Sequence, residues 1–100
     1  MKKAELKFEV QKQLWQLGHK VSDLEGIPGI GYDLLVDGKI RVGIFGILSG
    51  EATGVGVSMS YFKDCDIIAA MVDGKKMYAR LRKGIIDWKN PVAIFGPKSP

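Results

Sequence analysis

Apolar side chains near the N-terminus recur with the spacing of one face of an α-helix. Four of them stand at intervals of four, four and three residues: Leu6, Val10, Leu14 and Leu17. This spacing places them on one side of a helix, and Phe8 and Trp15, seven residues apart, are expected to widen that apolar face. We predict a helix from Lys3 to Leu17, which Gly18 ends.

Shorter apolar runs after residue 18 predict strands. The first three are expected at His19–Leu24, Tyr32–Val36 and Ile40–Leu48. The segment EGIPGIG between the first two is rich in glycine and proline and is predicted to be a loop. Asp37 and Gly38 separate the second and third strands, which is a strong signal for a β-hairpin.

A second hairpin is predicted in the C-terminal half. The run CDIIAAMV is continuously apolar and fits a strand buried on both faces. Asp73 and Gly74 form its turn, and KMYARL is the returning strand. Between the hairpins, the glycine-rich segment 49–60 is predicted to be a loop that leads into a short helix or turn near 58–63.

These elements predict an α+β fold, in which the N-terminal helix packs on a mixed sheet built from two β-hairpins. A chain of 100 residues fits one domain, and we place that domain at 1–96. The last four residues, 97–100, are expected to fray.

Composition and charge limit the binding partners and the cellular location that we expect for this protein. The net charge of +4 is compatible with nucleic-acid binding but is common in other proteins too. The apolar runs are shorter than the ~20 residues that a membrane span needs, and no apolar core follows the charged N-terminus as in a secretory signal. The single cysteine, Cys65, leaves no internal disulfide and no multi-cysteine zinc site. We expect a cytoplasmic protein, and the few asparagine, glutamine and cysteine residues favour a thermophilic source.

Several short motifs occur in a consistent order along the chain. LxxxG closes the predicted helix at 14–18, GxGYDLLV (29–36) and IRV (40–42) form the first hairpin, and FKDCDII (62–68) leads into the buried strand. In order and spacing they resemble the PD-(D/E)xK nuclease superfamily, particularly small archaeal proteins similar to Holliday-junction resolvases. The resemblance covers residues 6–81 and implies a restriction-endonuclease-like core.

This resemblance implies specific residues on the first hairpin. The family has an aspartate on the first strand and, on the second strand, an acidic residue followed two positions later by lysine. The carboxylates hold Mg²⁺, which activates water. Asp33 matches the first aspartate, but Gly43 stands where the acid belongs and Phe45 where the lysine belongs. Glycine offers no ligand and phenylalanine no charge, so the resemblance implies a degenerate site.

An active Mg²⁺-dependent endonuclease is the first alternative. It needs Asp33 as the metal ligand and Glu51, in the glycine-rich loop, as a carboxylate that has migrated. A helical glutamate often completes the family's site and would fall near Lys7, which leaves Glu9 or Glu5 for that role.

The register of the first hairpin decides whether Asp33 reaches the site. A two-residue turn pairs Asp33 with Val42, whereas a three-residue loop pairs it with Gly43. Only the second register points Asp33 to the site face, because a slip of one residue turns every side chain to the other face. The sequence leaves both registers open.

Structural roles compete with chemical ones for several residues. Asp33 is equally well explained as a loop cap that accepts backbone N–H bonds. Phe45 has apolar neighbours and is predicted to lie in the core, and Cys65 is predicted to be a small core residue. His19 follows the glycine that ends the helix and is expected to be a surface or helix-capping histidine.

The second hairpin carries a separate signal. In KKMYARLRK, cationic and aromatic residues alternate with apolar ones, so one face of this strand is predicted to be basic. The face comprises Lys76, Tyr78, Arg80 and Arg82, and Lys75 and Lys83 extend its charge. Cationic groups suit phosphate oxygens and a tyrosine ring stacks on a base. The alternative is a solvated face whose charges protect an edge strand from aggregation.

Together these patterns favour a nuclease-like domain that binds nucleic acid, DNA in particular, without cleaving it and without a cofactor. The basic strand and Arg41 would contact the backbone. The second alternative is an interaction protein, which forms a homodimer or binds another chain through an apolar surface around Phe45, Trp88 and Phe95. A membrane partner is not expected.

Overall fold

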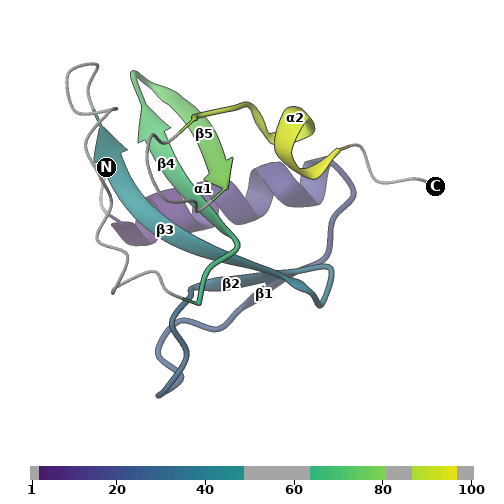
Figure 1. The fold of residues 1–100 in the computed structure, drawn as a ribbon, viewed down its shortest axis with the longest axis vertical. Coiled ribbons are helices and arrows are strands. Elements are labelled where there is room, and N and C mark those ends of the chain that lie inside the picture. Colours follow the sequence, from purple (N-terminus) through teal and green to yellow (C-terminus); the bar gives the residue numbers. More distant parts are fainter. Residues whose placement is uncertain (1–2, 49–63, 81–86, 97–100) are drawn as a thin grey trace.

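The computed structural model describes residues 3–48, 64–80 and 87–96. It has the predicted α+β fold, with an N-terminal helix packed on a five-stranded mixed sheet. Figure 1 shows this helix lying across one face of the sheet, with a short second helix beside the last strand. The elements are, in chain order, α1 (Lys3–Gln16), β1 (Val21–Asp23), β2 (Leu34–Val36), β3 (Ile40–Leu48), β4 (Ile67–Val72), β5 (Lys75–Arg80) and α2 (Pro91–Phe95).

The strands lie in the sheet in chain order, from β1 to β5. Neighbouring strands are antiparallel except for β3 and β4, which run parallel. A parallel pair needs a crossover connection; here it is 49–66, of which 49–63 lie outside the described residues. The predicted glycine-rich loop, the short helix or turn near 58–63 and the C-terminal tail at 97–100 also lie outside them.

Helix α1 presents one apolar face to the sheet. Leu6, Val10 and Leu14 are fully buried there, as the spacing predicted. The expectation that Phe8 and Trp15 widen this face is wrong, because their side chains are 58% and 52% exposed. Each residue turns the helix by about 100°, so Phe8, two positions from both Leu6 and Val10, points away from the sheet.

Apolar side chains form one cluster on each face of the sheet. Strand β4 contributes to both, with Ile67 on the face covered by α1 and Ile68 on the opposite face, so the prediction of a doubly buried strand is confirmed. Cys65 lies in the second cluster, as predicted for a small core residue. Its thiol donates a hydrogen bond to the carbonyl oxygen of Gly31 at 3.3 Å, and burial raises the pKa of Cys65 to about 12.

The short helix α2 is anchored at both of its ends. Asn90 caps its N-terminus by accepting a hydrogen bond from the N–H of Ala93 at 2.9 Å. Its Ile94 packs into the cluster on the α1 face. Just before the helix, Lys89 exchanges two main-chain hydrogen bonds with Tyr78 of β5, at 2.8 and 2.7 Å. The C-terminal segment therefore covers part of the outer edge of the sheet.

Candidate functional site

The first hairpin adopts the longer of the two connections. Leu34 pairs with Val42, and this register leaves the three residues 37–39 between β2 and β3. Asp33 lies just before the first pair of this register, and its main-chain N–H donates to the carbonyl oxygen of Val42 at 3.0 Å. Of the two connections that the sequence left open, the hairpin has the three-residue one.

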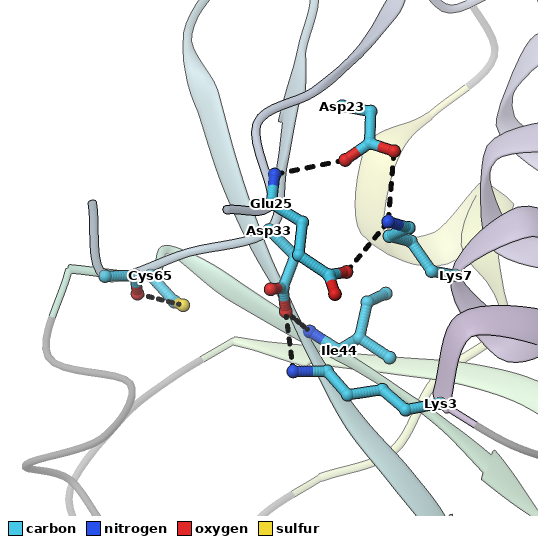
Figure 2. A network of polar contacts seen from close by, with 8 residues as sticks. Lys3, Lys7, Asp23, Glu25, Asp33, Ile44 and Cys65 are labelled. Carbon is cyan, nitrogen blue, oxygen red and sulfur yellow. Dashed lines mark hydrogen bonds and ion pairs between the residues drawn. The ribbon is translucent and has the colours of Figure 1, made fainter. Parts of the chain in front are cut away.

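The carboxylate of Asp33 is bound by groups of this chain. Its Oδ2 accepts a hydrogen bond from the main-chain N–H of Ile44 at 2.7 Å and lies 3.6 Å from Nζ of Lys3 (Figure 2). Strand β2 begins only at Leu34, so it provides no main-chain partner for the N–H of Ile44. The carboxylate of Asp33 accepts that hydrogen bond instead. The structural role considered for Asp33, as an acceptor of backbone N–H bonds, is confirmed.

Two lysines one turn apart on α1 face the acidic groups at this end of the sheet. Lys3 faces Asp33, while Nζ of Lys7 lies 3.0 Å from Oδ2 of Asp23 and 2.8 Å from Oε2 of Glu25 (Figure 2). The hydrogen bond to Glu25 raises the pKa of Lys7. Burial acts to raise the pKa of Asp23, but hydrogen bonds from Lys7 and from the Glu25 main chain lower it overall. A cation thus stands where the resemblance implies a helical glutamate.

The second strand of the hairpin brings no ligand to Asp33. Gly43 is buried and has no side chain to offer. Phe45 is half-buried and packs on the second cluster, where its ring centroid lies 6.4 Å from that of Trp88. The predicted core role of Phe45 is therefore confirmed.

The described residues give no evidence that a glutamate joins Asp33 in an active site. Oε2 of Glu9 lies 3.5 Å from Nζ of Lys76 on β5, and β5 is separated from β2 by β3 and β4. Three strand spacings amount to about 14 Å, so Glu9 is far from Asp33. Glu5 is exposed in the first turn of α1, and Glu51 lies outside the described residues. Among the residues that are described, no group of three or more histidine, cysteine or acidic side chains could hold a metal ion.

Arg41 forms an ion pair with Asp66, the residue just before the neighbouring strand β4. Its Nε and Nη2 donate to the two carboxylate oxygens of Asp66 at 3.1 and 2.9 Å, and its main-chain N–H donates to the same group at 2.9 Å. The hydrogen bond from Arg41 lowers the pKa of Asp66, and the same contact raises the pKa of Arg41. This bidentate pair joins the starts of the parallel strands β3 and β4. A phosphate contact by Arg41 would have to compete with Asp66.

The predicted basic face of β5 is not an open surface. Tyr78 is 0% exposed, and its hydroxyl donates a hydrogen bond to Oε1 of Gln13 on α1 at 2.6 Å. The ring also meets Phe95 edge-on, at a centroid distance of 5.2 Å, and burial raises the pKa of Tyr78. The expectation that Tyr78 stacks on a base is therefore wrong. The alternation of residues along β5 does place them on two faces of the sheet. The face that carries Tyr78, however, is covered by α1.

The charged residues around Tyr78 differ in exposure. Lys76, half-buried, forms the ion pair with Glu9 described above. Lys75 and Arg80, at the two ends of β5, are exposed. Arg82 and Lys83 fall outside the described residues. On β5, the exposed cations are thus Arg80, on the predicted face, and Lys75, which alternation places on the opposite face.

His19 is a functional candidate that the sequence did not identify. It was expected on the surface or at the helix end, but only 6% of it is exposed, so the surface expectation is wrong. Its main-chain N–H does bind the carbonyl of Leu14 at 3.0 Å, next to the end of α1. Its ring contacts Asp37 and Gly96, which are 18 and 77 positions away. No local pattern signals partners this distant.

Comparisons with known proteins give no relative for this chain: no family model, no curated protein and no solved structure matches it. Within 3–48, 64–80 and 87–96, no helix is long and apolar enough to cross a membrane.

Proposed function

We propose that this chain is a nuclease-like domain that binds the sugar-phosphate backbone of nucleic acid without cleaving it. One observation supports the claim that the domain does not cleave nucleic acid. Asp33 binds the Ile44 N–H and faces Lys3, while Gly43 and Phe45, at the two remaining site positions, offer no ligand. A single bound carboxylate is a poor substitute for the two that hold Mg²⁺.

The order of the elements supports the nuclease-like part. A helix precedes three antiparallel strands, and a fourth strand then runs parallel to the third. The first hairpin also has the three-residue connection, 37–39, that the nuclease-like arrangement of Asp33 needs. Both features agree with what the sequence resemblance implies. Fold alone does not establish function, so the binding half needs a support of its own.

Charge supports the binding half. The chain carries a net charge of +4, and β5 exposes Lys75 and Arg80 at its ends, with Arg82 and Lys83 following in sequence. Such groups bind phosphate oxygens without reading bases. We place this binding in the cytoplasm, in line with the single cysteine of the chain.

Paired charge variants test this binding. Lys75→Ala combined with Arg80→Ala removes two cations from β5, and Lys12→Ala combined with Lys39→Ala removes two exposed cations from elsewhere. Affinity for labelled duplex, single-stranded and four-way-junction DNA would be measured across a salt series. We expect only the β5 variant to flatten the plot of log affinity against log salt, by about 1.8 for two lost duplex contacts. An equal effect of both variants would contradict a binding site on β5.

An interaction domain is a second candidate, and one observation favours it. Phe8 and Trp15, both more than half exposed, lie on the outward side of α1. The surface originally considered for contacts is less suitable, since Phe45 packs on Trp88 and Phe95 on Tyr78. This candidate predicts a dimer in light scattering that Phe8→Ser with Trp15→Ser dissociates. It also predicts no salt-dependent DNA affinity.

A further inference from the structure

His19 lies where three distant parts of the chain meet. Nδ1 of its ring lies 2.7 Å from Oδ2 of Asp37, in the turn between β2 and β3. Nε2 lies 3.3 Å from the carbonyl oxygen of Gly96, immediately after α2. The His19 side chain is only 4% exposed. The ring therefore bridges the first hairpin and the C-terminal helix inside the protein.

Both partners of the ring are hydrogen-bond acceptors. An ionised carboxylate and a main-chain carbonyl carry no proton to donate. A neutral imidazole has a single N–H and would set a lone pair against one of them, whereas an imidazolium has two N–H groups. The contacts of His19 with Asp37 and Gly96 therefore fit the doubly protonated ring.

A main-chain donor and an aromatic ring fix the positions of the Asp37 carboxylate and the His19 imidazole. The main-chain N–H of Lys20 donates to Oδ1 of Asp37 at 2.9 Å, which holds the carboxylate towards His19. The ring of Phe95 packs on the imidazole at a centroid distance of 5.6 Å. From β5, the titratable group nearby is Tyr78, whose hydroxyl is bound to α1 and whose pKa burial raises. In the part of the chain that the structure describes, Asp37 is the charged side chain that contacts the ring.

We propose that His19 is a pH-dependent latch that holds α2 against the first hairpin. The doubly protonated ring joins Asp37 to Gly96, and loss of the Nε2 proton leaves two electron pairs facing each other and frees the end of α2. The latch is therefore fully closed at low pH and weakens as the pH rises. Histidine side chains ordinarily change charge between about pH 5 and 8, so the latch is tested across that range.

Opening this latch would have a defined structural consequence. Phe95 packs on both His19 and Tyr78, and Lys89 pairs with the outer edge of β5 at Tyr78. Loosening α2 would therefore uncover the tyrosine ring and free an edge of the sheet. This inference does not depend on nucleic-acid binding, since the contacts that carry it lie within the chain.

Amide hydrogen exchange followed by NMR tests the latch. The N–H groups of Ala93, Ile94 and Gly96 report on α2, because each is bound within that helix or its cap. The N–H of Ala69, in β4 between β3 and β5, serves as the internal reference. Rates would be corrected for the pH dependence of chemical exchange. From pH 5.5 to 8.5 we expect the protection of the α2 amides to fall about tenfold, the worth of one hydrogen bond, with little change at Ala69.

Two variants separate the latch from ordinary weakening of α2. His19→Gln cannot change charge, so its α2 protection should be low and independent of pH. Asn90→Ala removes the cap of α2 and should lower protection at every pH while keeping the tenfold change. Wild-type protection that does not vary with pH, or a tenfold change retained in His19→Gln, would overturn the proposal.

The protonation of the ring can be followed directly in the wild-type protein, which keeps the test independent of whether His19→Gln folds. Nitrogen chemical shifts of His19 should show two protonated ring nitrogens at pH 5.5, and one of these protons should be lost over the same pH range as α2 loosens. A ring with only one proton at pH 5.5, in a protein whose α2 is closed, would overturn the latch.

Discussion

The same four residues, Val-Asp-Gly-Lys, connect the strands of both hairpins, at 36–39 and 72–75. The backbone is alike in both turns. Asp37 and Asp73 have φ of 54° and 48°, and the glycines that follow have φ of 72° and 83°. The register differs, since the first connection leaves three residues between its strands and the second leaves two. Identical local sequence therefore does not determine how the strands pair.

The two aspartates also have different surroundings. Asp37 accepts hydrogen bonds from the ring of His19 and from the main chain of Lys20, and its own N–H donates to the carbonyl of Lys20 at 2.8 Å. Asp73 is exposed. The turn sequence thus sets the sign of φ in both hairpins, whereas tertiary partners give one of them an added anchoring role.

The largest effect is expected from removing the anchoring carboxylate. Asp37→Ala and Asp73→Ala both place alanine at positive φ, so that cost is common to the pair. Asp37→Ala also removes two hydrogen bonds and leaves His19 buried without its charged partner. We expect it to lower the free energy of unfolding by about 3 kcal/mol more than Asp73→Ala. Urea denaturation of both variants would measure this, and equal losses would contradict an anchoring role for Asp37.

The backbone common to both turns predicts a smaller and equal effect. Gly38 and Gly74 have positive φ, and a Cβ added at either would have no atom within 4 Å. Gly38→Ala and Gly74→Ala should therefore each cost only the conformational penalty, about 1 kcal/mol. Thermal and urea unfolding of the two variants should agree. A clear difference would mean that the tertiary contacts of the first hairpin also constrain its glycine.

The smallest effect concerns the pair that joins the two hairpins, Arg41 and Asp66. The folded-state pKa of Asp66 lies below its ordinary value, so its contribution is present above pH 4 and is lost as the pH falls through that lower folded value. Asp66→Asn should lower stability at pH 7 by less than about 1 kcal/mol, because both side chains are partly exposed. Urea midpoints of variant and wild type should converge once the pH lies below that lowered pKa. A gap that persists there would contradict an electrostatic origin.

Much of the fold followed from hydrophobic periodicity. The spacing of Leu6, Val10 and Leu14 predicted α1, and the continuous run in β4 predicted a doubly buried strand. The sequence alone could have placed Phe8 and Trp15 correctly, because a rotation of 100° per residue puts both side chains on the opposite side of the helix from that face. The hairpin register was not readable, since an Asp-Gly pair serves both a two-residue and a three-residue connection.

The site was less predictable because its contacts are distant in sequence. Alternation along β5 separated its two faces correctly, but the partner that buries Tyr78 is Gln13, 65 positions away. The contacts of His19 are equally nonlocal. For Asp33, both the structural and the catalytic role needed a partner on β3, and the structure supplies the Ile44 N–H. The sequence shows which side chains could bind a ligand or take part in catalysis. The tertiary contacts determine which of them are free to do so.

The role of Asp33 is the central claim, and a cleavage assay tests it most directly. Wild type and Asp33→Asn would be incubated with labelled duplex, single-stranded and four-way-junction DNA, each with Mg²⁺, Mn²⁺ or EDTA. Cleavage products would be separated on denaturing gels, and complexes formed across a salt series on native gels. We predict intact DNA under every condition, together with a gel shift that weakens steeply with salt and is the same for both proteins. Cleavage that requires metal and disappears in Asp33→Asn would show that Asp33 is a catalytic ligand and would contradict the account.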